Sequence, residues 1–261
     1  MLIDTHAHLY LPDFADDREE MEARAREAGV GMVVLPNIDE DSIRLVRDLV
    51  DSDPEFYKAG MGLHPFSVKK DWKTQLEHIL RELDGGDYIA VGEIGTDRYW
   101  DMSLINEQEE AFREQLRWGR ETGLPVIIHS RDSLDENIAI LKELQDGRLR
   151  GIFHCFNGTE EQGLEILDMG FLLGMGGVIT FKNAGLSTMV EALPLEGMVL
   201  ETDAPYLTPV PFRGKRNESA YVKYVAERIA LIKGIELEKV EEVTSRVASA
   251  LFFHEVPDFQ K

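Results

Sequence analysis

A pair of histidines near the start of the chain could bind a metal ion. The run LIDTHAH at 2–8 begins with apolar residues and ends in His6 and His8. In a β-strand, side chains two residues apart lie on the same face and about 6.5–7 Å apart along the backbone, so both imidazoles could reach one ion. Two unrelated surface or core histidines are the alternative interpretation. The choice depends on whether further ligands follow later strands.

Other metal-binding side chains lie at or just after the ends of later apolar runs. Imidazole and carboxylate groups are preferred ligands of Zn²⁺ and also bind Mn²⁺, Fe²⁺, Co²⁺ and Ni²⁺. Four histidines and two carboxylates exceed what one tetrahedral ion needs, so the sequence predicts two divalent ions about 3.5–4 Å apart. The predicted metal ligands are His6, His8, Glu93, His129, His154 and Asp203.

The remaining histidines are interpreted differently. His64, in GLHP at 62–65, follows the third apolar run and is expected to contact the substrate, with or without touching a metal. His78 lies within a helical pattern and His254 lies in the C-terminal tail. We expect both of these side chains at the surface.

The expected secondary structure would bring the candidate ligands together. Eight strand-like runs alternate with amphipathic helical stretches, which predicts a (β/α)8 TIM barrel, with an open doubly wound sheet as the alternative. The C-terminal strand ends of such a barrel form one face, and that face carries the chemistry. The expected strands are 2–8, 30–36, 56–63, 88–94, 124–129, 150–154, 171–175 and 198–202, and the expected helices are 13–28, 39–51, 73–84, 105–122, 133–145, 159–169 and 185–193.

The chain shows no linker or composition change that would mark a domain boundary. We therefore expect residues 1–261 to form a single barrel domain, which the resemblance described below assigns to the metal-dependent hydrolases. After the eighth strand come a loop at 204–218 and two helical patterns at 219–232 and 236–253, which could supply the last barrel helix and one cover helix.

Composition limits the class of protein. A net charge of −21 argues against a protein that coats nucleic acid, because nonspecific binding depends on Lys and Arg contacts to phosphates. There is no long apolar run or secretory signal pattern, so we expect no membrane association and a cytoplasmic location. The single cysteine, Cys155, excludes an intramolecular disulfide and fits a reducing compartment.

Basic side chains near the predicted mouth could hold an anionic substrate. Arg131 follows His129 by two residues, Lys182 follows the seventh strand, and Arg213, Lys215 and Arg216 lie in the loop after the eighth. Arginine can bind a phosphate with two parallel hydrogen bonds, whereas lysine supplies a point charge. An ordinary solvated charge run is the alternative.

Three further residues near the same strand ends could influence the site. An unpaired base could stack on an aromatic residue of the mouth loops, among which Tyr99 and Tyr206 are the first to test. Glu201 lies two residues before Asp203 and should share its face, where it could adjust Asp203 without binding the substrate.

The motifs together resemble the TatD family of metal-dependent deoxyribonucleases. They occur in the family's order over essentially the whole chain, and the departures are small. Arg98 stands where the family has an aromatic residue and could add a phosphate contact, and Ser219 stands where the family has Pro. The matching motifs are IDTHAHL at 3–9, GLHP at 62–65, VGEIGTD at 91–97, LPVIIHSRD at 124–132, HCFNG at 154–158, ITFKNA at 179–184, LETDAPYLTP at 200–209 and RGKRNE at 213–218.

The resemblance implies an amidohydrolase-type barrel with two divalent metal ions. His6, His8 and Asp203 would hold one ion, a second would lie at His129 and His154, and Glu93 would be shared. Family members act as Mg²⁺- or Mn²⁺-dependent nucleases, with 3′-5′ exonuclease activity on single-stranded DNA, and some structures carry zinc or nickel instead.

We therefore expect hydrolysis of DNA phosphodiester bonds by a metal-activated water. Asp203 and Glu93 are the expected catalytic residues, with Asp203 accepting the proton of the water. DNA would bind transiently as substrate, without an obligatory protein partner. The alternatives are an amidohydrolase-type enzyme acting on a small amide, lactone or other ester, and a noncatalytic binding module whose metals are structural.

Overall fold

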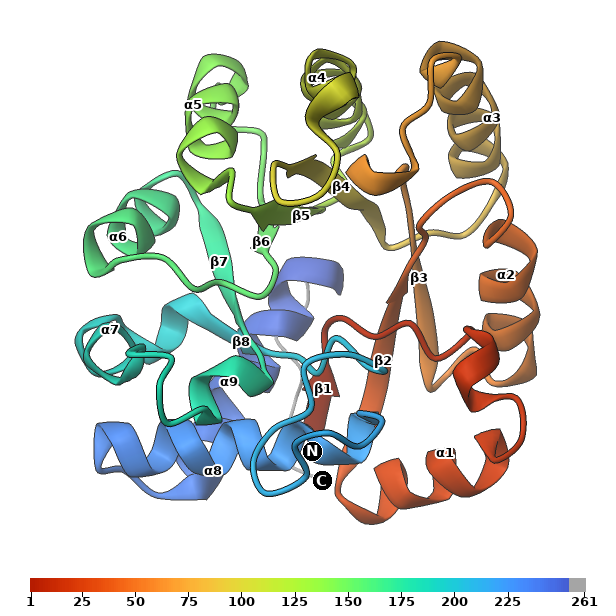
Figure 1. Cartoon of the computed structure of the whole chain (residues 1–261). Helices are drawn as coiled ribbons and strands as arrows, with labels where there is room; N and C mark the ends of the chain where they lie inside the picture. Colours follow the sequence, from red (N-terminus) through yellow and green to blue (C-terminus); the bar gives the residue numbers. More distant parts are fainter. Residues whose placement is uncertain (254–261) are drawn as a thin grey trace.

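The computed structural model describes residues 1–253 and contains eight parallel strands in a nearly closed barrel with helices around it (Figure 1). Each strand pairs with the next in chain order, which confirms the predicted (β/α)8 barrel; a doubly wound sheet would begin with a central strand. The strands are β1 (Leu2–Asp4), β2 (Val30–Pro36), β3 (Tyr57–Met61), β4 (Ala90–Asp97), β5 (Val126–Arg131), β6 (Gly151–Phe153), β7 (Phe171–Met175) and β8 (Met198–Leu200).

Irregular backbone hydrogen bonds join the first and last strands. The Thr5 amide donates to the Leu200 carbonyl at 2.9 Å, and the Asp203 amide donates to the His6 carbonyl at 2.9 Å. The His8 amide then donates to the Ala204 carbonyl at 2.7 Å. These contacts explain why β1 ends earlier than the expected 2–8 strand, since the segment after Asp4 bonds to the last residue of β8 and to the loop after it, outside a regular ladder.

The helices surround the sheet and mostly follow the expected ranges. The helix expected at 13–28 begins at Arg18, because Pro12 opens a separate 3-10 turn, Pro12–Phe14. The pattern at 219–232 likewise divides into the 3-10 turn Ser219–Tyr221 and α8. The helices are α1 (Arg18–Glu27), α2 (Ile43–Ser52), α3 (Trp72–Gly85), α4 (Ile105–Thr122), α5 (Leu134–Leu144), α6 (Glu160–Asp168), α7 (Ser187–Ala192), α8 (Val222–Lys233) and α9 (Leu237–Phe253).

The last helix closes the N-terminal end of the barrel. Leu251 and Phe252 of α9 pack with inward-facing strand residues such as Ile3 and Ile127 in one buried cluster. Ser245 of α9 donates to the Met1 carbonyl at 2.7 Å, beside the start of β1. Helix α9 therefore supplies the expected cover helix and leaves the C-terminal strand ends as the face available for a site (Figure 1). Within residues 1–253, no helix combines the length and apolar character needed to span a membrane.

Candidate metal centre

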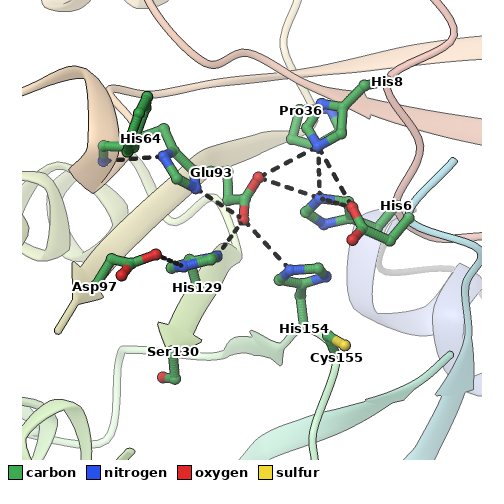
Figure 2. A network of polar contacts seen from close by, with 12 residues as sticks. His6, His8, Pro36, His64, Glu93, Asp97, His129, Ser130, His154 and Cys155 are labelled. Carbon is green, nitrogen blue, oxygen red and sulfur yellow. Dashed lines mark hydrogen bonds and ion pairs between the residues drawn. The ribbon is translucent and has the colours of Figure 1, made fainter. Parts of the chain in front are cut away.

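Glu93 lies at the middle of a cluster of imidazoles and carboxylates at the C-terminal end of the barrel (Figure 2). In the β4–β5 ladder, Gly92 pairs with Ile127 and Ile94 pairs with Ile128, so Glu93 is an extra, bulged residue. A bulge re-aims the side chain that it carries. The carboxylate of Glu93 consequently lies among the histidines, with its side chain only 3% exposed.

One carboxylate oxygen of Glu93 faces the ligands from the start of the chain. Its Oε2 lies 3.2 Å from Nε2 of His6 and 3.5 Å from Nε2 of His8. The Asp203 carboxylate approaches the same two nitrogens, at 3.8 and 3.6 Å. Three elements distant in sequence thus direct ligand atoms at one point.

The other oxygen of Glu93 faces the histidines of later strands. Its Oε1 lies 2.9 Å from Nδ1 of His129 and 3.4 Å from Nε2 of His154. The two ligand sets implied by the family resemblance therefore lie against different oxygens of one carboxylate.

Hydrogen bonds orient two of the imidazoles. The Tyr10 hydroxyl donates to the Pro36 carbonyl at 2.8 Å, so it accepts from Nδ1 of His8 at 2.9 Å. The Glu201 carboxylate lies 3.1 Å from Nδ1 of His154. Each contact places the proton on Nδ1 and leaves the Nε2 lone pair directed at the centre. Glu201 thus bonds to His154, a contact that the sequence did not predict, and its charge also acts on Asp203 by raising the pKa of that carboxyl.

Asp97 orients His129 and was missed as a functional residue in the sequence. Its Oδ2 lies 3.1 Å from Nε2 of His129, so the proton is held there and Nδ1 faces Glu93. Its Oδ1 accepts from the backbone amides of Tyr99 and Trp100, at 2.9 and 3.3 Å. The motif VGEIGTD contained the signal, but the fourth strand was expected to end at 94, three residues before Asp97.

His64 joins the same cluster with different chemistry. Its Nδ1 accepts from the Phe66 amide at 3.0 Å, which leaves the proton of the neutral ring on Nε2. That nitrogen lies 3.5 Å from Oε1 of Glu93. In this tautomer the Nε2–H group of His64 faces the Glu93 carboxylate, in keeping with a role that does not require metal binding.

A second buried network supports the turn that carries Asp203. Asp4 accepts from the Thr202 hydroxyl and the Ser219 hydroxyl, both at 2.6 Å. Asn217 donates to the carbonyls of Thr202 and Tyr206, at 2.7 and 2.6 Å. These bonds hold both sides of Asp203, whose backbone has a φ of 57°. Neither Asp4 nor Asn217 was singled out in the sequence.

The electrostatics of the cluster favour a bound cation. Burial, together with the charges of Glu93 and Glu201, raises the pKa of Asp203 well above its ordinary value. Burial alone would also raise the pKa of Glu93, but the surrounding imidazoles, chiefly His6, hold it well below its ordinary value. The negative charges of Glu93 and Asp203 repel each other, and a cation bound between the two carboxylates would remove this repulsion.

The donor set fits divalent metal ions, which take imidazole nitrogens and carboxylate oxygens together. Ligand atoms within each of three groups lie within 4.8 Å of one another. The groups are His6, His8 and Asp203; His6, Glu93 and His154; and His64, Glu93 and His129. His6 and Glu93 each belong to two of the groups, but only Glu93 offers a separate ligand atom to each set, with Oε2 toward His6 and Oε1 toward His129, so it is the residue that two neighbouring ions would share.

The predicted substrate-binding cations differ in their surroundings. Arg131, Lys182 and Arg213 are exposed, and within residues 1–253 none of the three contacts a carboxylate. Arg216 instead forms a bidentate ion pair with Asp17, at 2.7 Å for each bond. That pair joins the loop after β8 to the start of α1, so substrate contact by Arg216 stays a prediction.

Two other basic and imidazole groups lie away from the centre. Arg98, for which a phosphate contact was expected, bonds to Glu109 at 2.8 Å and approaches Glu136 at 3.4 Å. His78 is half exposed on α3 and pairs with Glu40, as a surface residue was expected to do. His254 lies outside the described residues.

Comparisons with known proteins identify the family of the chain. Residues 3–253 match the family model described as TatD related DNase. The chain is 40% identical over 254 residues to the uncharacterized metal-dependent hydrolase YabD of Bacillus subtilis, covering 97% of this chain and 99% of that protein. It is 30% identical over 258 residues to the 3′-5′ ssDNA/RNA exonuclease TatD of Pantoea ananatis, covering 96% and 99%.

A solved structure of a related protein has the same fold. The crystal structure of YjjV, a TatD homologue from Escherichia coli, superimposes with a TM-score of 0.90 at 30% identity, covering 96% of this chain and 97% of that one. Fold, ligand set and relatives lead to the same conclusion. The chain belongs to the TatD family and is a metal-dependent hydrolase.

Proposed function

We propose that this hydrolase cleaves phosphodiester bonds of DNA, acting as a 3′-5′ exonuclease on single strands with two divalent ions. The observation that carries the proposal is the position of Glu93, whose two oxygens face separate sets of ligands. Two ions bound there would activate a water and stabilise the charge on both the attacking and leaving oxygens. Mg²⁺ or Mn²⁺ is the proposed working metal, and the histidine-rich set also suits Zn²⁺ or Ni²⁺.

The protein residues have separate roles in this proposal. Asp203 accepts the proton of the attacking water, because its side chain is 14% exposed while that of Glu93 is 3% exposed. Glu93 contacts both ligand sets, one with each carboxylate oxygen, and so would fix the distance between the two ions. The exposed cations Arg131, Lys182 and Arg213 hold the phosphate groups, for which they have no competing carboxylate within residues 1–253.

The names of relatives support a nucleic-acid substrate. The proteins of Pantoea ananatis and Rahnella, 30% and 32% identical to this chain, are both named as 3′-5′ ssDNA/RNA exonucleases. Hydrolysis of a small amide or lactone is the alternative on the same barrel. The exposed cations at the mouth favour an anionic phosphodiester over a neutral substrate.

A substrate panel separates the two reactions. The purified protein is assayed with single-stranded oligonucleotides, N-acyl amino acids and lactones. We expect turnover of the oligonucleotide and a loss of at least about 100-fold in Asp203→Asn, which removes the proton acceptor. His78→Asn is the matched control, because it changes a histidine on the surface and should leave activity unchanged. Turnover of the amides or lactones alone would overturn the proposal.

A further inference from the structure

We propose that Tyr99, Trp100 and Arg131 form a binding platform for an unpaired nucleobase of the substrate. These three residues, termed the β4–β5 platform, follow β4 and end β5 at the mouth of the barrel. The inference rests on the proposed nuclease function and specifies how the substrate is held beside the metal centre.

The β4–β5 platform consists of flat, exposed groups in contact with one another. Tyr99 and Trp100 are 52% and 61% exposed, with ring centres 4.9 Å apart and ring planes perpendicular at 90°. The guanidinium of Arg131 lies 3.9 Å from the centre of the Tyr99 ring and 5.3 Å from that of Trp100. Large aromatic groups are normally buried, so two adjacent exposed rings beside an arginine mark a binding surface.

The β4–β5 platform is fixed to the metal centre through Asp97. One oxygen of this carboxylate accepts from the backbone amides of Tyr99 and Trp100. The other oxygen lies 3.1 Å from Nε2 of His129, a predicted metal ligand. The Arg98 amide also donates to the Arg131 carbonyl at 2.9 Å, which joins the two strand ends. A base held on the platform is therefore positioned relative to the reacting phosphate.

The chemistry of these groups selects a base rather than another ligand. Aromatic rings and guanidinium planes stack on nucleobases of any sequence, and arginine also binds phosphate oxygens. A paired base inside a duplex has no free face to offer, so the β4–β5 platform favours single strands. In the eight-strand ring β8 lies across from β4, and its loop presents Arg213, whose guanidinium lies 3.6 Å from the Phe181 ring centre. A single strand could thus contact cations on both sides of the metal centre.

Kinetics of the metal-loaded enzyme test the platform. Single-stranded oligonucleotides with normal or abasic nucleotides at the 3′ end are compared for wild type, Tyr99→Ala and Trp100→Ala. Stacking contributes about 1–3 kcal/mol per base, so we expect KM for the normal end to rise about 5- to 150-fold in these variants. KM for the abasic end should stay near its wild-type value. Met102→Ala is the matched control, since Met102 is 53% exposed in the same loop.

A binding measurement provides a readout independent of cleavage. Trp100 is the most exposed of the three tryptophans, and Trp118 is only 4% exposed. Titration of the metal-loaded enzyme with dAMP should quench tryptophan fluorescence, whereas deoxyribose 5-phosphate should not. Trp100→Phe should remove this quenching.

The outcomes distinguish the two proposals. If wild type cleaves normal and abasic ends with the same KM, or dAMP quenches Trp100→Phe as strongly as wild type, the β4–β5 platform is overturned while the nuclease proposal stands. If wild type cleaves no oligonucleotide, the nuclease proposal fails, and with it the role of the platform in that reaction.

Discussion

The carboxylate of Asp97 lies 3.1 Å from one nitrogen of His129, while the other nitrogen of that ring lies 2.9 Å from Glu93. The ring is thereby held between two carboxylates. The pKa of His129 is lowered by burial, but hydrogen bonds to Asp97 and Glu93 outweigh this and raise it to about 9. Asp97 determines which nitrogen faces the metal centre.

Replacing Asp97 should therefore weaken metal binding without unfolding the barrel. In Asp97→Asn the amide accepts a weaker hydrogen bond from His129, and we expect metal affinity to fall about 10- to 100-fold. Chelator competition, with circular dichroism to check folding, measures the change. Asp101→Asn is the control, since the side chain of Asp101 caps the Ser103 amide in the same loop. Equal metal affinity in both variants would contradict the role of Asp97.

Glu93→Gln should reduce the number of bound ions. Glutamine has nearly the same size as glutamate but lacks the negative charge and the second carboxylate oxygen with which Glu93 would bind both ions. We expect wild type to bind two ions per chain and the variant at most one. Metal analysis of dialysed protein measures the ratio. Retention of two ions by Glu93→Gln would show that the carboxylate is not shared.

Ser219→Ala should affect both stability and activity. The lost hydrogen bond is made to the buried carboxylate of Asp4, and bonds to charged groups contribute about 1.5–3 kcal/mol to the free energy of unfolding. The turn that carries Asp203 also loses support, so we expect activity to fall.

Ser245→Ala is the matched control for this change, because it removes a neutral bond to the Met1 carbonyl at the far end of the barrel. It should cost about 0.5–1.5 kcal/mol and leave activity intact. Denaturant unfolding and hydrolysis assays measure both quantities. An equal effect of the two variants on activity would exclude a positioning role for Ser219.

The strand ends that carry most of the centre could be predicted from the sequence. Regularly spaced apolar runs indicate a barrel, and the C-terminal strand ends of a barrel lie on one face. Side-chain contacts between residues distant in the sequence could not be predicted in this way. Asp4 supports the Asp203 turn by accepting a hydrogen bond from Ser219, 215 residues later in the chain. Arg216 is held in an ion pair by Asp17, 199 residues earlier. Asp97 was missed because β4 pairs with β5 for three residues beyond the expected strand end.

The ion pair of Asp17 should make stability depend on pH at acid pH. Its hydrogen bond with Arg216, supported by Arg24, lowers the pKa of Asp17 from 3.8 to about 2. Because the pKa is lower in the folded state than in the unfolded state, the ion pair contributes its full stabilisation above about pH 4. This contribution to the free energy of unfolding is lost as the pH falls through about 2.

Asp17→Asn should therefore show a shallower fall in the free energy of unfolding between pH 4 and 2. Asp16→Asn changes the neighbouring exposed carboxylate and should keep the wild-type slope. Urea unfolding at a series of pH values gives both slopes. Identical slopes for wild type and Asp17→Asn would contradict the assignment.

Return of activity on adding metal tests the central claim most directly. Metal-stripped protein is incubated with 5′-labelled single- and double-stranded oligonucleotides, and Mg²⁺, Mn²⁺, Co²⁺ or Zn²⁺ is added back separately. We predict progressive shortening of the single strand from its 3′ end, only with a divalent ion and not in Asp203→Asn. Folded wild-type protein that shortens no oligonucleotide with any of these ions, or that cleaves equally well in excess chelator, would contradict the account.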